Sequence, residues 1–165
     1  MRIAVVTGNP KPASRTHNVA LAVAGALGSP SVVADLAEHA ASLFDWSEPS
    51  LSRLTEEVAA ADVAIFASPT YKAAYTGMLK AFLDRYGSNG LAGVVAVPVM
   101  TGGWAGHSLA VEVHLRPVLV ELGATVPSRG LYVTEPDLAD SASLDAAVGK
   151  WATAAVPLIE RALAG

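Results

Sequence analysis

The segment MRIAVVTGNPKPASRTHN, residues 1–18, determines how the rest of the chain is interpreted. Its apolar, β-branched run from Ile3 to Val6 predicts a buried strand that ends at Gly8. From about Thr16 the pattern becomes helical and rich in Ala, Leu and Val. A strand, a polar loop and a helix N-terminus in this order predict an anion site, because the first helical amides lack partners and the helix dipole favours negative charge.

The loop itself offers donors and positive charge for one phosphate group. These residues are Lys11, Ser14, Arg15, Thr16 and Asn18. The loop is no Walker A motif, because the second glycine is missing, and the dinucleotide fingerprint fails after Gly8. Flavodoxin-like folds use a hydroxyl-rich loop after the first strand to hold a flavin phosphate. An ordinary polar connection that binds nothing is the alternative.

Composition indicates one folded domain over residues 1–165, since the chain is 52% hydrophobic and only 16% charged. A net charge of -4 carries no basic excess, so we expect no nucleic-acid partner. No cysteine is present, which excludes disulfides and thiolate metal sites. No metal site is expected from the four histidines either, because none pair at ligand spacing: His17, His39, His107 and His114.

The first strand follows Met1 and Arg2 directly, which leaves no room for a signal peptide. No run of about 20 unbroken apolar residues exists, so we expect neither a membrane span nor a membrane partner. Both observations predict a cytoplasmic protein.

Apolar runs predict five strands that alternate with helices. The strands are expected at residues 3–6, 31–36, 62–67, 94–100 and 124–133. The helices are expected at residues 16–27, 51–60, 78–86, 104–122 and 141–164, with a kink at Pro157 in the last. Continuous apolar runs are typical of parallel strands covered on both faces. The fold expected is therefore a flavodoxin-like, doubly wound five-stranded parallel sheet of order 2-1-3-4-5, with helices on both faces.

Ligands of such sheets bind at the carboxyl ends of the strands, near the point where the strand order reverses. Three polar or glycine-containing loops follow the first, third and fourth predicted strands, and this rule brings them to one place. They are residues 7–16, residues 68–77 and residues 101–103.

These same loops resemble the NADPH-dependent FMN reductase family, most of all the reductases of two-component alkanesulfonate monooxygenase systems. The resemblance is carried by Gly8–Thr16, by Ser68–Lys80, which reads SPTYKAAYTGMLK, and by Thr101–Gly103. The stretches Ala110–Glu112 and Leu115–Leu119 resemble the long helix of that group. The likeness runs from Met1 to about Val133, and the middle block is its most specific part.

The resemblance implies a role for each loop. The FMN phosphate would be held, around Gly8, by Asn9, Lys11, Ser14, Arg15 and Thr16. The isoalloxazine and ribityl chain would be lined by Pro69, Thr70, Tyr71 and Lys72. Backbone of Thr101, Gly102 and Gly103 would face the polar edge of the ring.

The chain departs from the family pattern at three positions. Asn9 and Lys11 stand where Ser and Arg are usual, which implies weaker or monodentate phosphate contacts. Val113-His114 occupies the region where alkanesulfonate-type reductases often insert a Tyr that forms a π-bulge. The tetramer-interface behaviour linked to that Tyr is therefore not carried over.

The expected activity is hydride transfer from NADPH or NADH to FMN, which then supplies a flavin-dependent monooxygenase. No catalytic acid or base is expected, because the cofactors carry this chemistry. Two alternatives remain: an FMN-retaining quinone or azo-dye reductase, and a non-enzymatic flavin-binding electron carrier. Apolar residues Val111, Leu115, Val118 and Leu122, together with Trp104 and Val113, predict a homodimer or homotetramer, since one sheet face would not cover them all.

Overall fold

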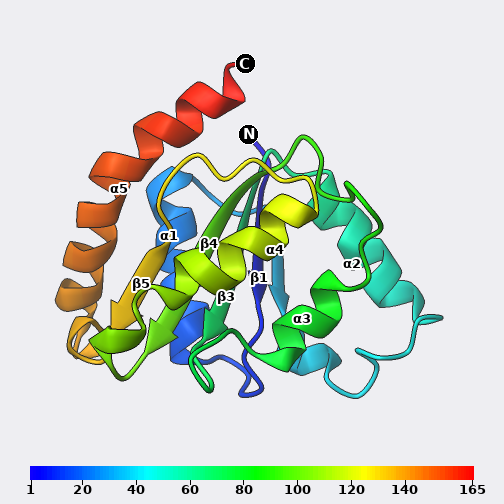
Figure 1. Cartoon of the computed structure of the whole chain (residues 1–165), viewed down its shortest axis with the longest axis horizontal. Coiled ribbons are helices and arrows are strands. Elements are labelled where there is room, and N and C mark those ends of the chain that lie inside the picture. The colour runs from blue at the N-terminus through cyan, green and yellow to red at the C-terminus, as the bar shows by residue number, and fades with distance from the viewer.

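Five parallel strands form the centre of the molecule in the computed structural model, which describes residues 1–165. Their order is β2-β1-β3-β4-β5, which confirms the predicted order (Figure 1). The bounds are β1 Ile3–Thr7, β2 Val32–Asp35, β3 Val63–Pro69, β4 Val95–Gly102 and β5 Leu131–Thr134. All four strand pairings are parallel, so the carboxyl ends of the strands share one edge of the sheet, which is the lower edge in Figure 1.

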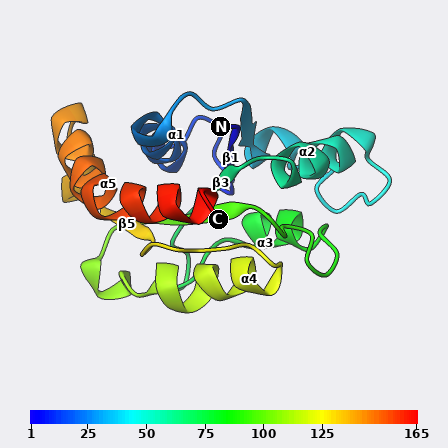
Figure 2. The ribbon, with the colours of Figure 1, turned by 90° about the horizontal axis from the view of Figure 1, so that it is seen from above.

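Helices cover both faces of this sheet, as predicted (Figure 2). Helices α1 (Arg15–Leu27) and α5 (Ser141–Leu163) pack on one face and contact each other. Helices α2 (Pro49–Ala59), α3 (Gly77–Leu83) and α4 (Arg116–Glu121) pack on the opposite face. None of the helices is long and apolar enough to cross a membrane.

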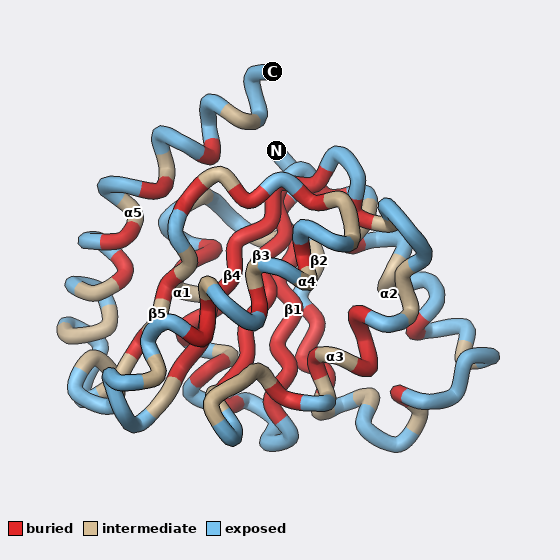
Figure 3. The backbone as a smooth tube through the Cα atoms, viewed as in Figure 1, coloured by how far each residue is buried: buried red, intermediate tan, exposed pale blue.

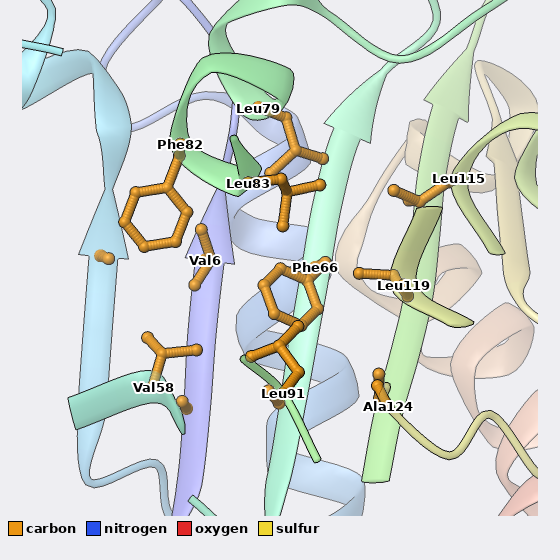
Figure 4. Packing of buried hydrophobic residues seen from close by; sticks show 14 of the residues in the cluster. Val6, Val58, Phe66, Leu79, Phe82, Leu83, Leu91, Leu115, Leu119 and Ala124 are labelled. Carbon is orange, nitrogen blue, oxygen red and sulfur yellow. The ribbon is translucent and has the colours of Figure 1, made fainter. Parts of the chain in front are cut away.

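The sheet separates two apolar clusters, because successive side chains of a strand point to opposite faces. On the face of α2, α3 and α4, Phe66 lies among Leu83, Leu91 and Leu119, and all four are completely buried (Figure 4). On the other face, strand valines pack against α1 and α5. The central strands β1, β3 and β4 are therefore buried along almost their whole length, whereas the loops at the carboxyl ends of the strands are largely exposed (Figure 3).

The strands β3 and β4 extend further at their carboxyl ends than the sequence predicted, and β2 and β5 are shorter. The ladder between β3 and β4 continues through Ser68↔Met100 to Pro69↔Thr101, so residues expected in loops are paired. Pro69 is tolerated there because the next amide, that of Thr70, donates to the carbonyl of Thr101 at 2.7 Å. The predicted start of the last strand at residue 124 was wrong, because apart from one bridge between Val95 and Thr125 regular pairing begins only at Leu131.

The predicted long helix over residues 104–122 was also wrong in its first part. Trp104 is extended, residues Ala105–His107 form a 3₁₀ turn, and residues Val111–Leu115 form a π-helical segment that leads into α4. The amide of Arg116 donates to the carbonyl of Val111, five residues back. Pro117 has no amide hydrogen, so the regular α-helical bonding cannot pass through it. The π segment therefore forms here without an inserted tyrosine.

This π segment and α4 carry two apolar stripes on opposite sides. Val111 and Leu115 are buried against the sheet, and Val118 and Leu122 pack against the same cluster. Val111 and Leu115 therefore cannot contribute to the predicted subunit interface, and Val118 and Leu122 are partly buried in the protomer, whereas Trp104 and Val113, which were predicted with them, are exposed. A different stripe is exposed, and its members are Leu109, Val113 and Val120, which are 61%, 55% and 52% accessible.

Candidate functional site

The loop between β1 and α1 is held in shape by three hydrogen bonds. Ser14 is the N-cap of α1, and its hydroxyl accepts from the amide of His17 at 3.2 Å. The amide of Lys11 donates to Asn9 Oδ1 at 3.0 Å, and the amide of Ala13 donates to the carboxylate of Asp35 at 2.8 Å. The second bond ties the loop to the end of β2 and supports the left-handed φ of 48° at Ala13.

Buried side chains join this loop to the end of β4. The hydroxyls of Thr16 and Thr101 lie 2.7 Å apart, and Asn9 Nδ2 donates to Thr16 Oγ1 at 3.3 Å. All three residues are at most 8% accessible although they are polar. Since buried polar atoms are stable only with partners, this network fixes the relative position of the two loops.

Thr76 joins the loop after β3 to the first loop. Its hydroxyl donates to the carbonyl of Gly8 at 2.6 Å and accepts from the amide of Leu79, so it is also the N-cap of α3. The Thr76 amide donates to Ser68 Oγ at 2.9 Å. Between these residues, Tyr71 and Ala74 pair across a two-residue turn in which Lys72 and Ala73 both have positive φ.

A cavity of about 300 Å³ opens where the three loops meet. Its predicted lining residues are Asn9, Lys11, Ser14, Arg15, Thr16, Pro69, Thr70, Tyr71, Thr101, Gly102 and Gly103. Gly8 and Lys72, which sequence reasoning placed with them, do not line it. Gly8 is instead buried under Leu79, and Lys72 is exposed in the turn.

Two lining residues were missed by sequence reasoning, Glu135 and Leu138. Both follow β5, in the segment that leads through a 3₁₀ turn at Pro136–Leu138 to α5. The rule that ligands bind at strand carboxyl ends applies to this strand as well. An acidic residue directly after the last apolar run was the signal that could have identified Glu135.

Arg15 and Glu135 form a bidentate ion pair at the mouth of the cavity. Nη1 of Arg15 lies 2.5 Å from Oε2, and Nη2 lies 2.7 Å from Oε1. Hydrogen bonding to Arg15, together with its charge, lowers the pKa of Glu135, and the same contact raises the pKa of Arg15. Lys11 has no such acidic partner, so its charge remains uncompensated beside the cavity.

Several donors around the cavity lack acceptors in the protein. The amides of Arg15 and Thr16, in the first turn of α1, donate to no protein atom. The buried hydroxyl of Thr70 also has no hydrogen-bond partner. At Gly102 a Cβ would lie 2.0 Å from the Tyr132 hydroxyl and 3.3 Å from Thr70 Oγ1, so only glycine lets the backbone lie this close to them. Unpaired amides with adjacent positive charge fit a phosphate, and the unpartnered Thr70 hydroxyl fits a further polar group of FMN.

The candidate aromatic and histidine side chains lie in different places. Tyr71 lines the cavity and is 53% accessible, whereas Tyr75 packs partly against the core cluster. Trp104 is 66% accessible and stacks edge-on against His107. His17 lies outside the cavity lining, with Nδ1 3.0 Å from Thr7 Oγ1. Of these five residues, only Tyr71 lines the cavity.

Comparison with known proteins identifies a family and several relatives that are similar to this chain. The family model described as NADPH-dependent FMN reductase matches residues 1–137. An "FMN reductase (NADPH)" of Escherichia coli is 40% identical over 95 residues, which cover 58% of this chain and 50% of that protein. The "NADH-dependent FMN reductase SfnF" of Pseudomonas putida is 30% identical over 144 residues, which cover 81% and 77%. The matched segment thus spans about half the length of the first curated relatives.

Solved structures give the same result for the fold. The apo form of the NADH:FMN oxidoreductase EMOB has a TM-score of 0.78 and 32% identity, over 92% of this chain and 88% of that one. A flavodoxin, WrbA-like protein from Agrobacterium tumefaciens has a TM-score of 0.68 at 17% identity, over 98% and 96%. The second similarity concerns the flavodoxin-like fold alone.

Proposed function

This chain belongs to the NADPH-dependent FMN reductase family, and from that premise we propose that it transfers hydride from NADPH or NADH to FMN in one flavodoxin-like domain. The observation that carries the proposal is the cavity at the switch point of the sheet, whose unpaired amides and basic side chains suit a flavin phosphate. Bound FMN supplies the hydride-accepting ring. Reduced nicotinamide nucleotides are cytoplasmic metabolites, which supports a cytoplasmic location.

The protein would contribute binding and orientation to this reaction. The phosphate would be held by the residues that line the cavity from the β1–α1 loop: Asn9, Lys11, Ser14, Arg15 and Thr16. Pro69, Thr70 and Tyr71 would lie along the ribityl chain and ring, and the backbone of Thr101–Gly103 would stabilise charge at the ring's polar edge. Lys72 and Gly8 would shape these loops without touching the flavin.

We further propose that reduced FMN leaves the site and supplies a partner monooxygenase, as the sequence resemblance implies. Arg15, Tyr71 and Glu135 line the cavity and are exposed to solvent, which supports exchange of the flavin. Steady-state oxidation of NADPH and NADH with free FMN, FAD and riboflavin tests the activity. We expect turnover with added FMN and loss of flavin during purification. Flavin that stays bound and passes electrons to quinones or azo dyes would contradict the supply role.

A homodimer or homotetramer is the expected assembly. Its support is the exposed stripe of Leu109, Val113 and Val120, which runs from just before the π-helical segment into α4. Light scattering should give two or four times the protomer mass of 16.8 kDa. Val113→Lys should lower that mass, whereas Val33→Lys, another exposed valine outside the stripe, should leave it unchanged. A monomer at micromolar concentration would contradict the proposal.

A further inference from the structure

Glu135 occupies an unusual position for an acidic residue, because it lines the same cavity as the basic residues of the phosphate loop. Its carboxylate engages both terminal nitrogens of Arg15, 120 positions earlier in the chain. Arg15 is the first residue of α1, beside the unpaired amides of that helix. An anion that enters the cavity therefore meets an arginine that already has an anionic partner.

We propose that Glu135 is an internal competitor for Arg15, which lowers the affinity for phosphate-bearing flavins and so makes the flavin exchangeable. This inference rests on the proposed function as an FMN reductase. Arg15 binds either Glu135 or the flavin phosphate through its terminal nitrogens, and the two states differ in which anion it holds. Glu135 is thus a residue that sets flavin affinity through Arg15, without a part in hydride transfer.

The charges around the cavity indicate that Glu135 competes with the flavin phosphate for Arg15 and does not help Arg15 to bind it. Lys11 and Arg15 are the only cations that line it, and Glu135 offsets one of them. Asp35 lies under the same loop, where its carboxylate accepts from the amides of Ala13 and Ala37. The cavity lining therefore holds two cations and one carboxylate, a net charge of +1, before any phosphate arrives. These side chains balance only half of the charge of a dianionic phosphate, whereas a site built to retain the phosphate would match its charge.

The ion pair is also easy to exchange. The side chains of Arg15 and Glu135 are 63% and 51% accessible, so water replaces each partner when the pair opens. The contact lowers the pKa of Glu135, so its carboxylate stays charged at neutral pH and the competitor is always present. Arg15 can then turn to the phosphate at little cost, and Glu135 returns to it when the flavin leaves.

The test compares FMN with riboflavin, which lacks the phosphate, in the variant Glu135→Gln. Dissociation constants come from quenching of flavin fluorescence at low salt. We expect FMN to bind about three- to tenfold more tightly to the variant. A change of this size is expected when one exposed charge interaction, that of Glu135 with Arg15, no longer has to be broken. Riboflavin affinity should change less than about twofold, since no phosphate is present. The gain for FMN should shrink as ionic strength rises.

Two controls isolate the mechanism. Glu160→Gln removes the same charge from an exposed position on α5, far along the chain from the cavity residues, and should leave FMN affinity unchanged. In an Arg15→Gln background, Glu135→Gln should lose most of its effect, because the contested arginine is gone.

The outcomes separate this inference from the proposed function. Unchanged or weaker FMN binding by Glu135→Gln, with a parent protein that binds and reduces FMN, overturns the competition and leaves the reductase activity standing. Weaker binding would mean that Glu135 orients Arg15 for the phosphate. A parent protein that binds neither flavin and oxidises no nicotinamide nucleotide overturns both proposals.

Discussion

The floor and the rim of the candidate site are built in different ways. The floor consists of buried residues joined by hydrogen bonds across three loops, such as Thr16 to Thr101 and Thr76 to Gly8. The rim consists of exposed residues held by one ion pair, Arg15 to Glu135, and by the small turn next to Tyr71. Changes in the floor should therefore lower the free energy of unfolding, whereas replacing the exposed side chains that line the cavity at the rim should mainly change ligand binding.

The largest expected effect concerns the residues where floor and rim meet. Ser14→Ala combined with Arg15→Ala should weaken FMN binding by roughly 2–4 kcal/mol, because charge-assisted hydrogen bonds to the phosphate are lost. Riboflavin affinity should barely change. Titration of each single variant sharpens the comparison: Ser14→Ala should also lower stability through loss of the α1 cap, and Arg15→Ala should not. Equal weakening of both flavins would place the phosphate elsewhere.

The next largest effect is expected in the floor at Gly8. A Cβ there would lie 2.4 Å from Cβ of Leu79 and 2.8 Å from its Cα. Gly8→Ala should therefore cost about 3 kcal/mol of unfolding free energy, measured by urea denaturation. Gly149→Ala is the matched control, because that glycine lies inside α5 with open space around it. It should gain about 0.5–1 kcal/mol. A neutral Gly8→Ala would contradict the close packing of the floor.

Replacing Thr76 by valine, which has almost the same shape, tests the hydrogen bonds of the floor without a steric change. Thr76→Val removes the N-cap of α3 and leaves the Gly8 carbonyl without its donor, which should cost about 2 kcal/mol. Thr76→Ser keeps the hydroxyl and should recover most of this loss. If Val and Ser variants unfold at the same urea concentration, the hydroxyl does not join the two loops.

Floor and rim also differ in how well the sequence predicts them. The floor loops were predicted correctly because each follows an apolar run that marks a buried strand, as Val63–Ala67 precedes Ser68. Parallel strands bring their carboxyl ends together, so local patterns were enough. The exact strand ends were not predicted, because pairing of Pro69 with Thr101 depends on the partner strand.

At the rim, Arg15 and Tyr71 were predicted, but their acidic neighbour was not. The position of Glu135 after the last apolar run places it at the carboxyl edge of the sheet, whereas its pairing with Arg15, 120 positions away, is not visible in any local pattern. For a related reason, the sequence did not predict which apolar side chains of residues 109–122 face the sheet and which face solvent. A shift to π-helical spacing at Val111–Leu115 changes which side chains face the sheet, and a regular helical spacing does not show such a shift.

A small effect is expected at the turn on the rim. Ala73 has a φ of 65°, a left-handed conformation that costs an alanine energy and a glycine little. Ala73→Gly should therefore raise stability by about 0.5–1 kcal/mol and leave FMN affinity unchanged. Thermal unfolding and flavin titration on the same preparation measure both. Loss of FMN affinity would show that the strained turn positions Tyr71, so that the rim is more rigid than its exposure suggests.

The smallest expected effect is that of pH on turnover. The titratable groups that line the cavity are Lys11, Arg15, Tyr71 and Glu135, and no histidine is among them. The pKa of Glu135 is lowered by Arg15, so this carboxylate takes up a proton only well below neutral pH and stays charged above it. A general acid or base for this pH range would normally be a histidine or a carboxylate of raised pKa, and neither is present at the cavity.

Turnover at saturating FMN should accordingly change by less than about twofold between about pH 6 and pH 8.5. The apparent affinity for FMN should rise through about pH 6, since the phosphate gains its second charge there and the amides and Lys11 hold it more strongly. His17→Ala and Tyr71→Phe should each reduce the rate by less than about tenfold, against the 10²–10⁴ typical of a true acid or base. A bell-shaped profile that collapses in either variant would show that a floor or rim side chain transfers a proton. Hydride transfer would then depend on a residue of this chain, and not on binding and orientation alone.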